Sequence, residues 1–439
     1  PRRNPNRVPR IGLACPNSPD HIILALAILQ AGGCLVPIAQ ELAPPEREAI
    51  LQTVGLDAVI VSDKMPWPER ASGPGRAIPL PSLKATLYLD LGTTPPVEES
   101  CFAALNPAFI RFSSGTTGKA KGVILSHETL LARTETANQH LRITENDRIV
   151  WILSMAHHFA VSIMLYLLQG ATTIIVDQHL AEEILTAALK HGGTLLYGAP
   201  FHHALLAAEP SGRPWPTLRL AVSTAAPLSA EIAHAFHARF GVPISQALGI
   251  IEVGLPLLNF SPLTKPTAIG RATPYVEVQL RDPDTGAPVS AGTPGELYLR
   301  CKGMLDAYLS PWQPRSAFLT PDGWFCTGDL AVADADGDLH LVGRTKTVIN
   351  MGGSKCFPEE IEAVLQTHPE VAAVRVSGRP HPRFGSVPVA EIVPRNPAVP
   401  PAVSSLVALC RKSLAPYKIP LDFRFVETLP RTASGKIRR

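Results

Sequence analysis

The first sixty residues alternate short apolar runs with segments of helical length. Residues 11–60 have the pattern strand, helix, strand, helix, strand. Ser18-Pro19-Asp20 has the features of a helix start: a capping hydroxyl, a proline at the first helical position and an acid in the first turn. Gly32-Gly33 ends that helix, and short buried strands are expected at 34–38 and 57–62. The chain therefore begins with parallel βαβ units.

The alternation becomes regular between residues 148 and 247. Strands are expected at 148–153, 172–176, 194–197, 218–223 and 243–246, and helices at 158–168, 180–191, 200–208 and 228–239. Strands that alternate with helices of this length predict a parallel sheet with helices on both faces.

The pattern changes again after residue 269. From 269 to 342 short runs alternate apolar and polar residues between Pro, Gly and Asp turns, which predicts a small antiparallel sheet or distorted barrel. Residues 345–439 have the pattern of a compact α+β unit. We therefore expect an α/β protein with a large N-terminal domain, 1–344, and a small mobile C-terminal domain, 345–439.

Composition narrows the class of protein. A chain of 439 residues with 46% hydrophobic and 18% charged residues is long enough for two or three globular domains. A net charge of +3 argues against nucleic acid as the main partner, and no apolar stretch approaches the length of a membrane span. The seven cysteines are scattered without a Cys-x-x-Cys pair, which indicates reduced thiols and a cytoplasmic protein.

The most informative segment is a loop at residues 113–122, between apolar runs at 108–112 and 123–125. Three glycines, four hydroxyls and two lysines supply backbone N–H groups, hydroxyl donors and positive charge, which suit a phosphate. A lysine-tipped hairpin turn is the structural alternative. Only two residues separate Gly115 from Gly118, so the loop is not the P-loop of kinases and GTPases.

The order Ser-Ser-Gly-Thr-Thr-Gly-Lys-x-Lys-Gly resembles the phosphate loop of the adenylate-forming superfamily, which includes acyl- and aryl-CoA synthetases, peptide-synthetase adenylation domains and luciferase. Further segments that resemble motifs of this superfamily follow in its order: 31–38, 223–228, 246–252, 327–329, 343–344, 352–362 and 429–436. The resemblance covers nearly the whole chain and implies the same division into a large and a small domain.

The resemblance implies a set of ATP- and AMP-binding residues: Ser113, Ser114, Gly115, Thr116, Thr117, Gly118, Lys119, Thr224, Ala225, Ala226, Gln246, Leu248, Gly249, Ile251, Asp329 and Arg344. Asp329 would hold the ribose hydroxyls. Glu252 and Thr116 would bind Mg²⁺, a hard cation that is usually shared between carboxylates and phosphates.

Two positions depart plainly from the superfamily pattern, and Thr224, which stands in place of a glycine, is a milder departure. Leu248 replaces an aromatic residue near the adenine, and Ile251 replaces a threonine that hydrogen-bonds the α-phosphate. A donor to a charged oxygen contributes roughly 1.5–3 kcal/mol, so the second change affects rate or nucleotide affinity.

The small domain carries the other implied roles. Lys436 would be the catalytic lysine of adenylate formation, because an ammonium group offsets the charge that builds up at the α-phosphate; a frayed basic tail is the structural alternative. Lys346 would be the hinge, and Gly352 and Gly353 would line the tunnel for the thiol.

The segment around residue 157 corresponds to the acyl pocket, which would be lined by His157, His158, Phe159, Ser162, Ala225, Gly249 and Gly254. His157 would lie beside the substrate carboxylate and act in catalysis. No aspartate is present where amino-acid-activating members hold the ammonium group. An aryl acid similar to hydroxybenzoate, with His158 on a ring hydroxyl, or a fatty acid is therefore expected; a packed histidine would explain His158 equally well.

We therefore expect an ATP- and Mg²⁺-dependent acid–thiol ligase that forms an acyl-adenylate and then a thioester with CoA, working as a monomer or homodimer. A first alternative acceptor is the phosphopantetheine arm of an acyl carrier protein, which a basic face with Arg411, Lys412, Arg424 and Arg431 would suit. A second alternative, motivated by Leu248 and Ile251, is a degenerate member of the superfamily that binds a nucleotide or an acyl ligand without catalysing a reaction.

Overall fold

The structure is a computed structural model that describes residues 7–42, 44–65, 76–89, 91, 97–112, 121–177, 180–351, 354–431 and 437. The chain divides into two compact units. Unit 1 comprises Pro1–Glu277 and Leu299–Phe325, and unit 2 comprises Val278–Tyr298 and Cys326–Arg439. Each unit is described by itself.

Unit 1 contains a nine-stranded sheet in the order β18-β17-β7-β6-β2-β1-β3-β5-β4. Its strands are β1 (Arg10–Ala14), β2 (Cys34–Pro37), β3 (Ala58–Ser62), β4 (Ala77–Leu80), β5 (Ala85–Leu89), β6 (Pro107–Phe112), β7 (Gly122–Ser126), β17 (Ala307–Tyr308) and β18 (Gln313–Pro314). The four central strands are parallel, and antiparallel strands extend both edges. The helices of its N-terminal part are α1 (Pro19–Gln30), α2 (Pro44–Val54) and α3 (Glu99–Ala103). Helix α1 begins as predicted, because the Ser18 side chain accepts a hydrogen bond from the N–H of His21.

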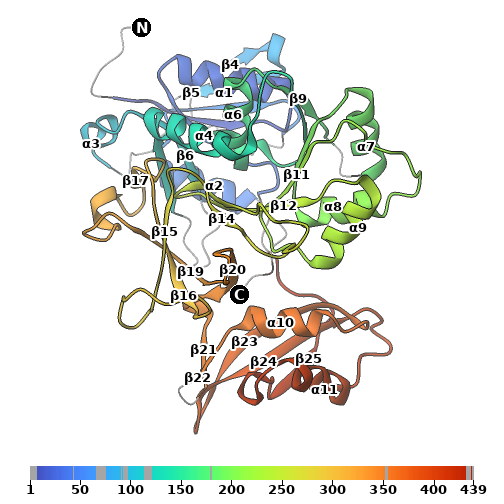
Figure 1. Cartoon of the computed structure of the whole chain (residues 1–439). Coiled ribbons are helices and arrows are strands. Elements are labelled where there is room, and N and C mark those ends of the chain that lie inside the picture. The colour runs from blue at the N-terminus through green and yellow to red at the C-terminus, as the bar shows by residue number, and fades with distance from the viewer. Residues whose placement is uncertain are drawn as a thin grey trace. The chain divides into compact units, whose positions relative to one another are not determined.

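The second sheet of unit 1 has the order β14-β13-β12-β11-β10-β8-β9. Its strands are β8 (Arg148–Trp151), β9 (Thr172–Ile175), β10 (Leu195–Gly198), β11 (Leu220–Ser223), β12 (Ile244–Ile250), β13 (Gly254–Leu258) and β14 (Arg271–Ala272). The strands from β9 to β12 are parallel, as predicted. Helices α7 (Ala181–Lys190), α8 (Pro200–Ala207) and α9 (Ala230–Phe240) lie together beside this sheet and share an apolar core with it (Figure 1).

The helical layer between the strands includes a π-turn. Helix α4 (His127–Leu141) contacts β6 and β7 of the first sheet and β13 of the second. The helix expected at 158–168 is composed of α5 (Met155–His158), the π-helical turn η3 (Phe159–Ile163) and α6 (Met164–Leu168). Such π-turns are frequent at functional sites, and this one follows the segment that carries His157.

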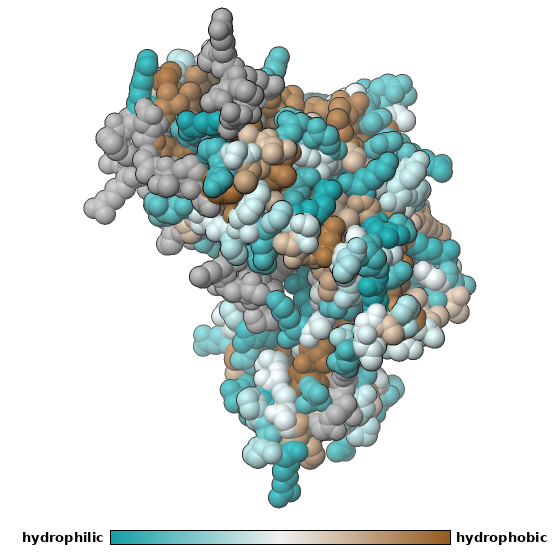
Figure 2. Space-filling model, turned by 90° about the vertical axis from the view of Figure 1, so that its left-hand side faces the viewer, coloured by the Kyte–Doolittle hydropathy of each residue, from teal (hydrophilic) through white to brown (hydrophobic). Residues whose placement is uncertain are grey.

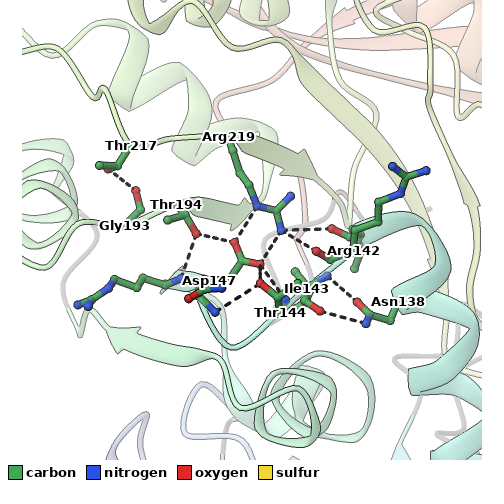
Figure 3. A network of polar contacts seen from close by, with 12 residues as sticks. Asn138, Arg142, Ile143, Thr144, Asp147, Gly193, Thr194, Thr217 and Arg219 are labelled. Atoms are coloured by element: carbon green, nitrogen blue, oxygen red, sulfur yellow. Dashed lines mark hydrogen bonds and ion pairs between the residues drawn. The ribbon is translucent and has the colours of Figure 1, made fainter.

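A polar network joins the amino ends of three parallel strands (Figure 3). Asp147, just before β8, accepts hydrogen bonds from Arg219 Nε at 2.7 Å and Nη2 at 2.8 Å, and from Thr194 Oγ1 at 2.8 Å. Thr194 directly precedes β10, and Arg219 directly precedes β11. These contacts satisfy the hydrogen-bonding capacity of a carboxylate that is almost completely buried. They therefore fix the positions of the three strands relative to one another at their amino ends, opposite to the carboxyl ends.

Unit 2 contains two sheets. The first, in the order β15-β16-β19-β20, comprises β15 (Glu277–Arg281), β16 (Gly295–Arg300), β19 (Phe325–Ala333) and β20 (Leu339–Arg344). The second comprises β21 (Ile349–Met351), β22 (Ser354–Cys356), β23 (Val371–His381), β24 (Gly385–Pro394) and β25 (Asp422–Phe425), with α10 (Pro358–Gln366) and α11 (Val403–Ser413). The α/β fold class is thereby confirmed. The domain boundary at residue 344 lies within unit 2, between its two sheets, and stays a prediction.

The surface of the protein mixes hydrophilic residues with separate apolar patches, as one face shows in Figure 2. Among the described residues, no helix combines the length and the apolar composition that a membrane crossing requires.

Candidate active site

The carboxyl ends of the parallel strands in the second sheet bring three predicted segments to one edge. These segments follow β8, β11 and β12 and carry His157, Thr224 and Glu252 respectively. Ligands in open parallel sheets bind outside this edge. The fold therefore gathers residues that are widely separated in the sequence into one candidate site.

The predicted phosphate loop joins two antiparallel strands. Phe112 at the end of β6 is opposite Gly122 at the start of β7, so the loop closes a hairpin. The predicted residues Ser113, Ser114, Gly115, Thr116, Thr117, Gly118 and Lys119 lie outside the described residues. Lys121 is described, and its Nζ lies 4.7 Å from the ring centre of Tyr308, which places positive charge at the exit of the loop.

Glu252, the predicted metal ligand, lies in the turn between β12 and β13. Tyr308 Oη donates a hydrogen bond of 3.1 Å to Glu252 Oε1, and the N–H of Leu305 donates one of 2.7 Å to the Glu252 carbonyl. Burial raises the pKa of Tyr308 far above its usual value, and the charge of Glu252 adds to this effect. A carboxylate held through one oxygen keeps acceptor sites for a hard cation, so Glu252 fits Mg²⁺.

Arg133 on α4 fixes the backbone of the same turn. Its Nη1 and Nη2 each donate a hydrogen bond of 2.8 Å, to the carbonyls of Ile251 and Glu252, and its Nε donates one of 2.6 Å to the Gly303 carbonyl. The side chain is 3% exposed, and burial lowers its pKa to about 10. Gly254 has φ +103°, and a Cβ there would lie 3.2 Å from Arg133 Cγ. Gly254, predicted in the acyl pocket, is therefore packed against this arginine.

The predicted adenine-binding segments lie directly after β11 and at the end of the neighbouring strand β12. A Cβ at Gly249 would lie 3.6 Å from Thr224 Oγ1, so these two predicted residues are close together. Ala225 and Ala226 are exposed, and Leu248 is half-buried. Ala225 adopts φ +72°, a left-handed conformation that favours glycine.

Gln246 has a structural role that sequence reasoning missed. Its Oε1 accepts a hydrogen bond of 2.5 Å from the N–H of Leu228, and its Nε2 donates one of 3.2 Å to the Thr267 carbonyl. The residue is 4% exposed. Its predicted contact with nucleotide stays a prediction, while its side chain already fixes the start of the segment before α9.

His157 has a partner that the sequence did not indicate. Its Nε2 lies 3.1 Å from Glu41 Oε1, and both side chains are partly exposed. Glu41 follows β2 of the first sheet, whereas His157 lies on α5 after β8 of the second. Polar residues directly after parallel strands are the only signal that could have pointed to Glu41.

The acyl-pocket segment divides into aromatic and core positions. The His158 ring lies edge-on to Trp151 at 5.7 Å and to Tyr197 at 6.2 Å. Phe159 is 1% exposed, contacts the His21 ring at 5.9 Å and belongs to the core. Ser162 is also buried. Burial raises the pKa of Tyr197 to about 12, so it remains a hydrogen-bond donor at neutral pH.

In unit 2 the structure brings together the two predicted ribose contacts. Asp329 is directly opposite Arg344 on the antiparallel strands β19 and β20, with 2.9 Å between Oδ1 and Nε. Lys346 is exposed in a short 3₁₀ turn after β20. Gly352, Gly353 and Lys436 lie outside the described residues.

Comparisons with known proteins show which family the two parts of the chain resemble. The family model for AMP-binding enzymes matches residues 4–309, and the model for the AMP-binding enzyme C-terminal domain matches residues 360–436. A naringenin synthase of Pestalotiopsis fici is 33% identical over 94% of the chain, which spans only 16% of that relative. A feruloyl-CoA synthase of Amycolatopsis is 29% identical over 98% of the chain and 87% of its own length. The crystal structure of ATP-bound MatB from Rhodopseudomonas palustris is 26% identical with a TM-score of 0.83, covering 98% of the chain and 87% of its own.

Proposed function

Because the chain belongs to the AMP-binding enzyme family, we propose that it is an ATP-dependent ligase that joins a carboxylic acid to the thiol of coenzyme A. The observation that carries the proposal is the meeting of Glu252, Thr224 and His157 at the carboxyl edge of one sheet. Relatives named as CoA ligases support CoA as the acceptor, and an ATP-bound structural neighbour supports ATP.

The proposed reaction has two steps. An oxygen of the acid attacks the α-phosphorus of ATP, and the bond from this phosphorus to the oxygen that bridges it to the β-phosphate breaks. Pyrophosphate departs, and the product that remains is an acyl-adenylate. The thiol then gives up its proton to water, its sulfur attacks the acyl carbon, the bond from that carbon to the phosphate oxygen breaks, and AMP leaves. Closing the site between these steps keeps the reactive mixed anhydride from water.

Each side chain has a proposed place in this reaction. Glu252, with Thr116, would hold Mg²⁺, which shields the charge of the phosphates. Asp329 and Arg344 would hold the ribose, His157 would contact the substrate carboxylate, and Lys436 would offset charge at the α-phosphate. Rotation of the C-terminal domain about Lys346 would remove Lys436 from the site and bring in Gly352 and Gly353, which would line the tunnel for the thiol.

An aryl acid is the substrate class that the site favours. His158 is half-buried, and its ring lies edge-on to the buried rings of Trp151 and Tyr197, so an aryl acid would meet this aromatic cluster through His158. A feruloyl-CoA synthase among the relatives acts on an acid of this class by its name. A fatty acid is the second candidate class.

The test is ATP–pyrophosphate exchange with a panel of benzoic, cinnamic and fatty acids. We expect exchange with at least one aryl acid, followed by thioester formation when CoA is added. Lys436→Ala should abolish exchange while leaving CoA thioester formation from supplied acyl-adenylate. Transfer only to a carrier protein would replace CoA as acceptor, and no exchange with any acid would favour the binding module.

A further inference from the structure

We propose that Glu41 is the positioning residue for His157: it holds the imidazole through Nε2 and thereby presents Nδ1 to the carboxylic acid. The inference rests on the proposed function for the identity of the ligand. It adds a residue from the first sheet of unit 1 to a site otherwise built on the second.

The geometry of the pair carries the inference. The distance of 3.1 Å between His157 Nε2 and Glu41 Oε1 is that of a hydrogen bond, in which the ring N–H donates to the carboxylate. The side chains of Glu41 and His157 are 28% and 29% exposed, so both reach the surface of the edge at which ligands bind. Among the described residues, His157 Nδ1 has no hydrogen-bond partner.

A second contact from the first sheet holds the backbone of the same segment. Asn17, which follows β1, donates from Nδ2 to the Leu153 carbonyl at 2.8 Å and accepts at Oδ1 from the N–H of Met155 at 2.8 Å. The backbone before α5 is therefore fixed by Asn17, and the imidazole at its end is fixed by Glu41. With both restraints the ring of His157 has a defined position and orientation.

The charge of Glu41 agrees with this role. Partial burial works to raise the pKa of its carboxyl, but the hydrogen bond from His157 and that from its own backbone outweigh burial and bring the pKa below its usual value. Glu41 is thus a carboxylate at neutral pH, and a carboxylate accepts only. The bonded Nε2 must carry the hydrogen, so Nδ1 is the nitrogen that faces a ligand.

A double-mutant cycle tests the coupling, with kcat/KM for the acid accepted in pyrophosphate exchange as the readout. We expect Glu41→Ala to reduce kcat/KM about 10- to 100-fold, with KM for ATP changed less than twofold. In the His157→Ala background, Glu41→Ala should have no further effect, because its action passes through the histidine. Glu48→Ala is the matched control, since Glu48 is exposed on α2 and, among the residues that the structure describes, accepts a side-chain hydrogen bond from Gln52 alone. Independent, multiplicative losses at residues 41 and 157 would overturn the proposal.

Ring ¹⁵N spectra of the unmodified protein provide a measurement that does not depend on the folding of a variant. The signals that disappear in His157→Gln should show a hydrogen on Nε2 and none on Nδ1 in the neutral ring. The opposite tautomer would overturn the proposal even if activity were lost in Glu41→Ala. A protein that activates no acid would contradict the proposed function, whereas these spectra would still test the pair.

Discussion

Tyr308 Oη donates a hydrogen bond of 3.1 Å to Glu252 Oε1, and so joins the strand next to the predicted phosphate loop to the predicted metal ligand. Tyr308→Phe removes this donor while keeping the ring beneath Lys121. We expect the Mg²⁺ concentration for half-maximal pyrophosphate exchange to rise about tenfold, since a hydrogen bond to a charged group contributes about 1.5 kcal/mol.

Tyr298→Phe is the control for this prediction, because Tyr298 also donates to a glutamate, Glu296, at 3.3 Å. Its Mg²⁺ requirement should equal that of the unmodified protein. An unchanged requirement in Tyr308→Phe would show that the tyrosine does not orient the metal-binding carboxylate.

Ala225 offers a stabilising substitution. Its φ of +72° costs an alanine roughly 1–2 kcal/mol, a cost that glycine does not have. After the larger entropy of glycine in the unfolded chain is subtracted, we expect Ala225→Gly to raise the free energy of unfolding by about 0.5–1 kcal/mol in urea titrations. The neighbouring substitution Ala226→Gly relieves no such strain, so it should lower the free energy of unfolding by a similar amount. Equal effects of the two substitutions would contradict the strain.

His203 on α8 makes the stability of unit 1 sensitive to acid. It is completely buried, and neither ring nitrogen has a partner among the described residues. Burial, with a smaller effect of His202, lowers its pKa to about 3 from 6.5. Because the folded state binds the proton more weakly than the unfolded state, stability falls as the pH drops below about 6.5 and continues to fall until about pH 3.

His203→Leu removes this titration. We expect its free energy of unfolding to depend less steeply on pH between 6 and 4, by about 1.4 kcal/mol per pH unit. The prediction fails if the slopes of His203→Leu and the unmodified protein agree.

The polar network around Asp147 allows its contribution to the stability of the second sheet to be tested. Asp147→Ala leaves Arg219 and Thr194 without their shared acceptor at the start of three strands. We expect a loss of about 2–4 kcal/mol in the free energy of unfolding, as for other broken buried networks. Asp63→Ala at an exposed turn should change it by less than about 0.5 kcal/mol. A loss of free energy of unfolding in Asp147→Ala as small as that in Asp63→Ala would show that the network contributes little to stability.

Regular hydrophobic spacing was sufficient to predict the central strands of the second sheet, because a strand buried on both faces consists of a short apolar run. The resemblance to the superfamily, and not the hydrophobic pattern, assigned Asp329 and Arg344 to one site, and these residues are paired on adjacent strands. The π-turn at 159–163 was not predicted, because its apolar pattern does not differ from that of an α-helix. Short edge strands such as β4 were not predicted either, because four residues that include a proline show no apolar–polar alternation.

The partners of the site residues could not be predicted for a different reason. Arg133 lies 119 residues before Glu252, and Tyr308 lies 56 residues after it, and each is brought there by tertiary packing alone. Glu41 reaches His157 from a different sheet. One sequence shows which residue types follow each strand, but it contains no measure of which of these segments face each other.

Unit 1 is discontinuous in the chain, since Leu299–Phe325 returns to it after a segment that belongs to unit 2. The returning segment provides β17, which pairs with β7 and completes that side of the first sheet with β18. During synthesis on the ribosome, β7 therefore has an unpaired edge until residues beyond 308 have emerged from the exit tunnel. Such an edge is a site for aggregation, so a nascent chain stalled before this point would depend on chaperones to remain competent for folding.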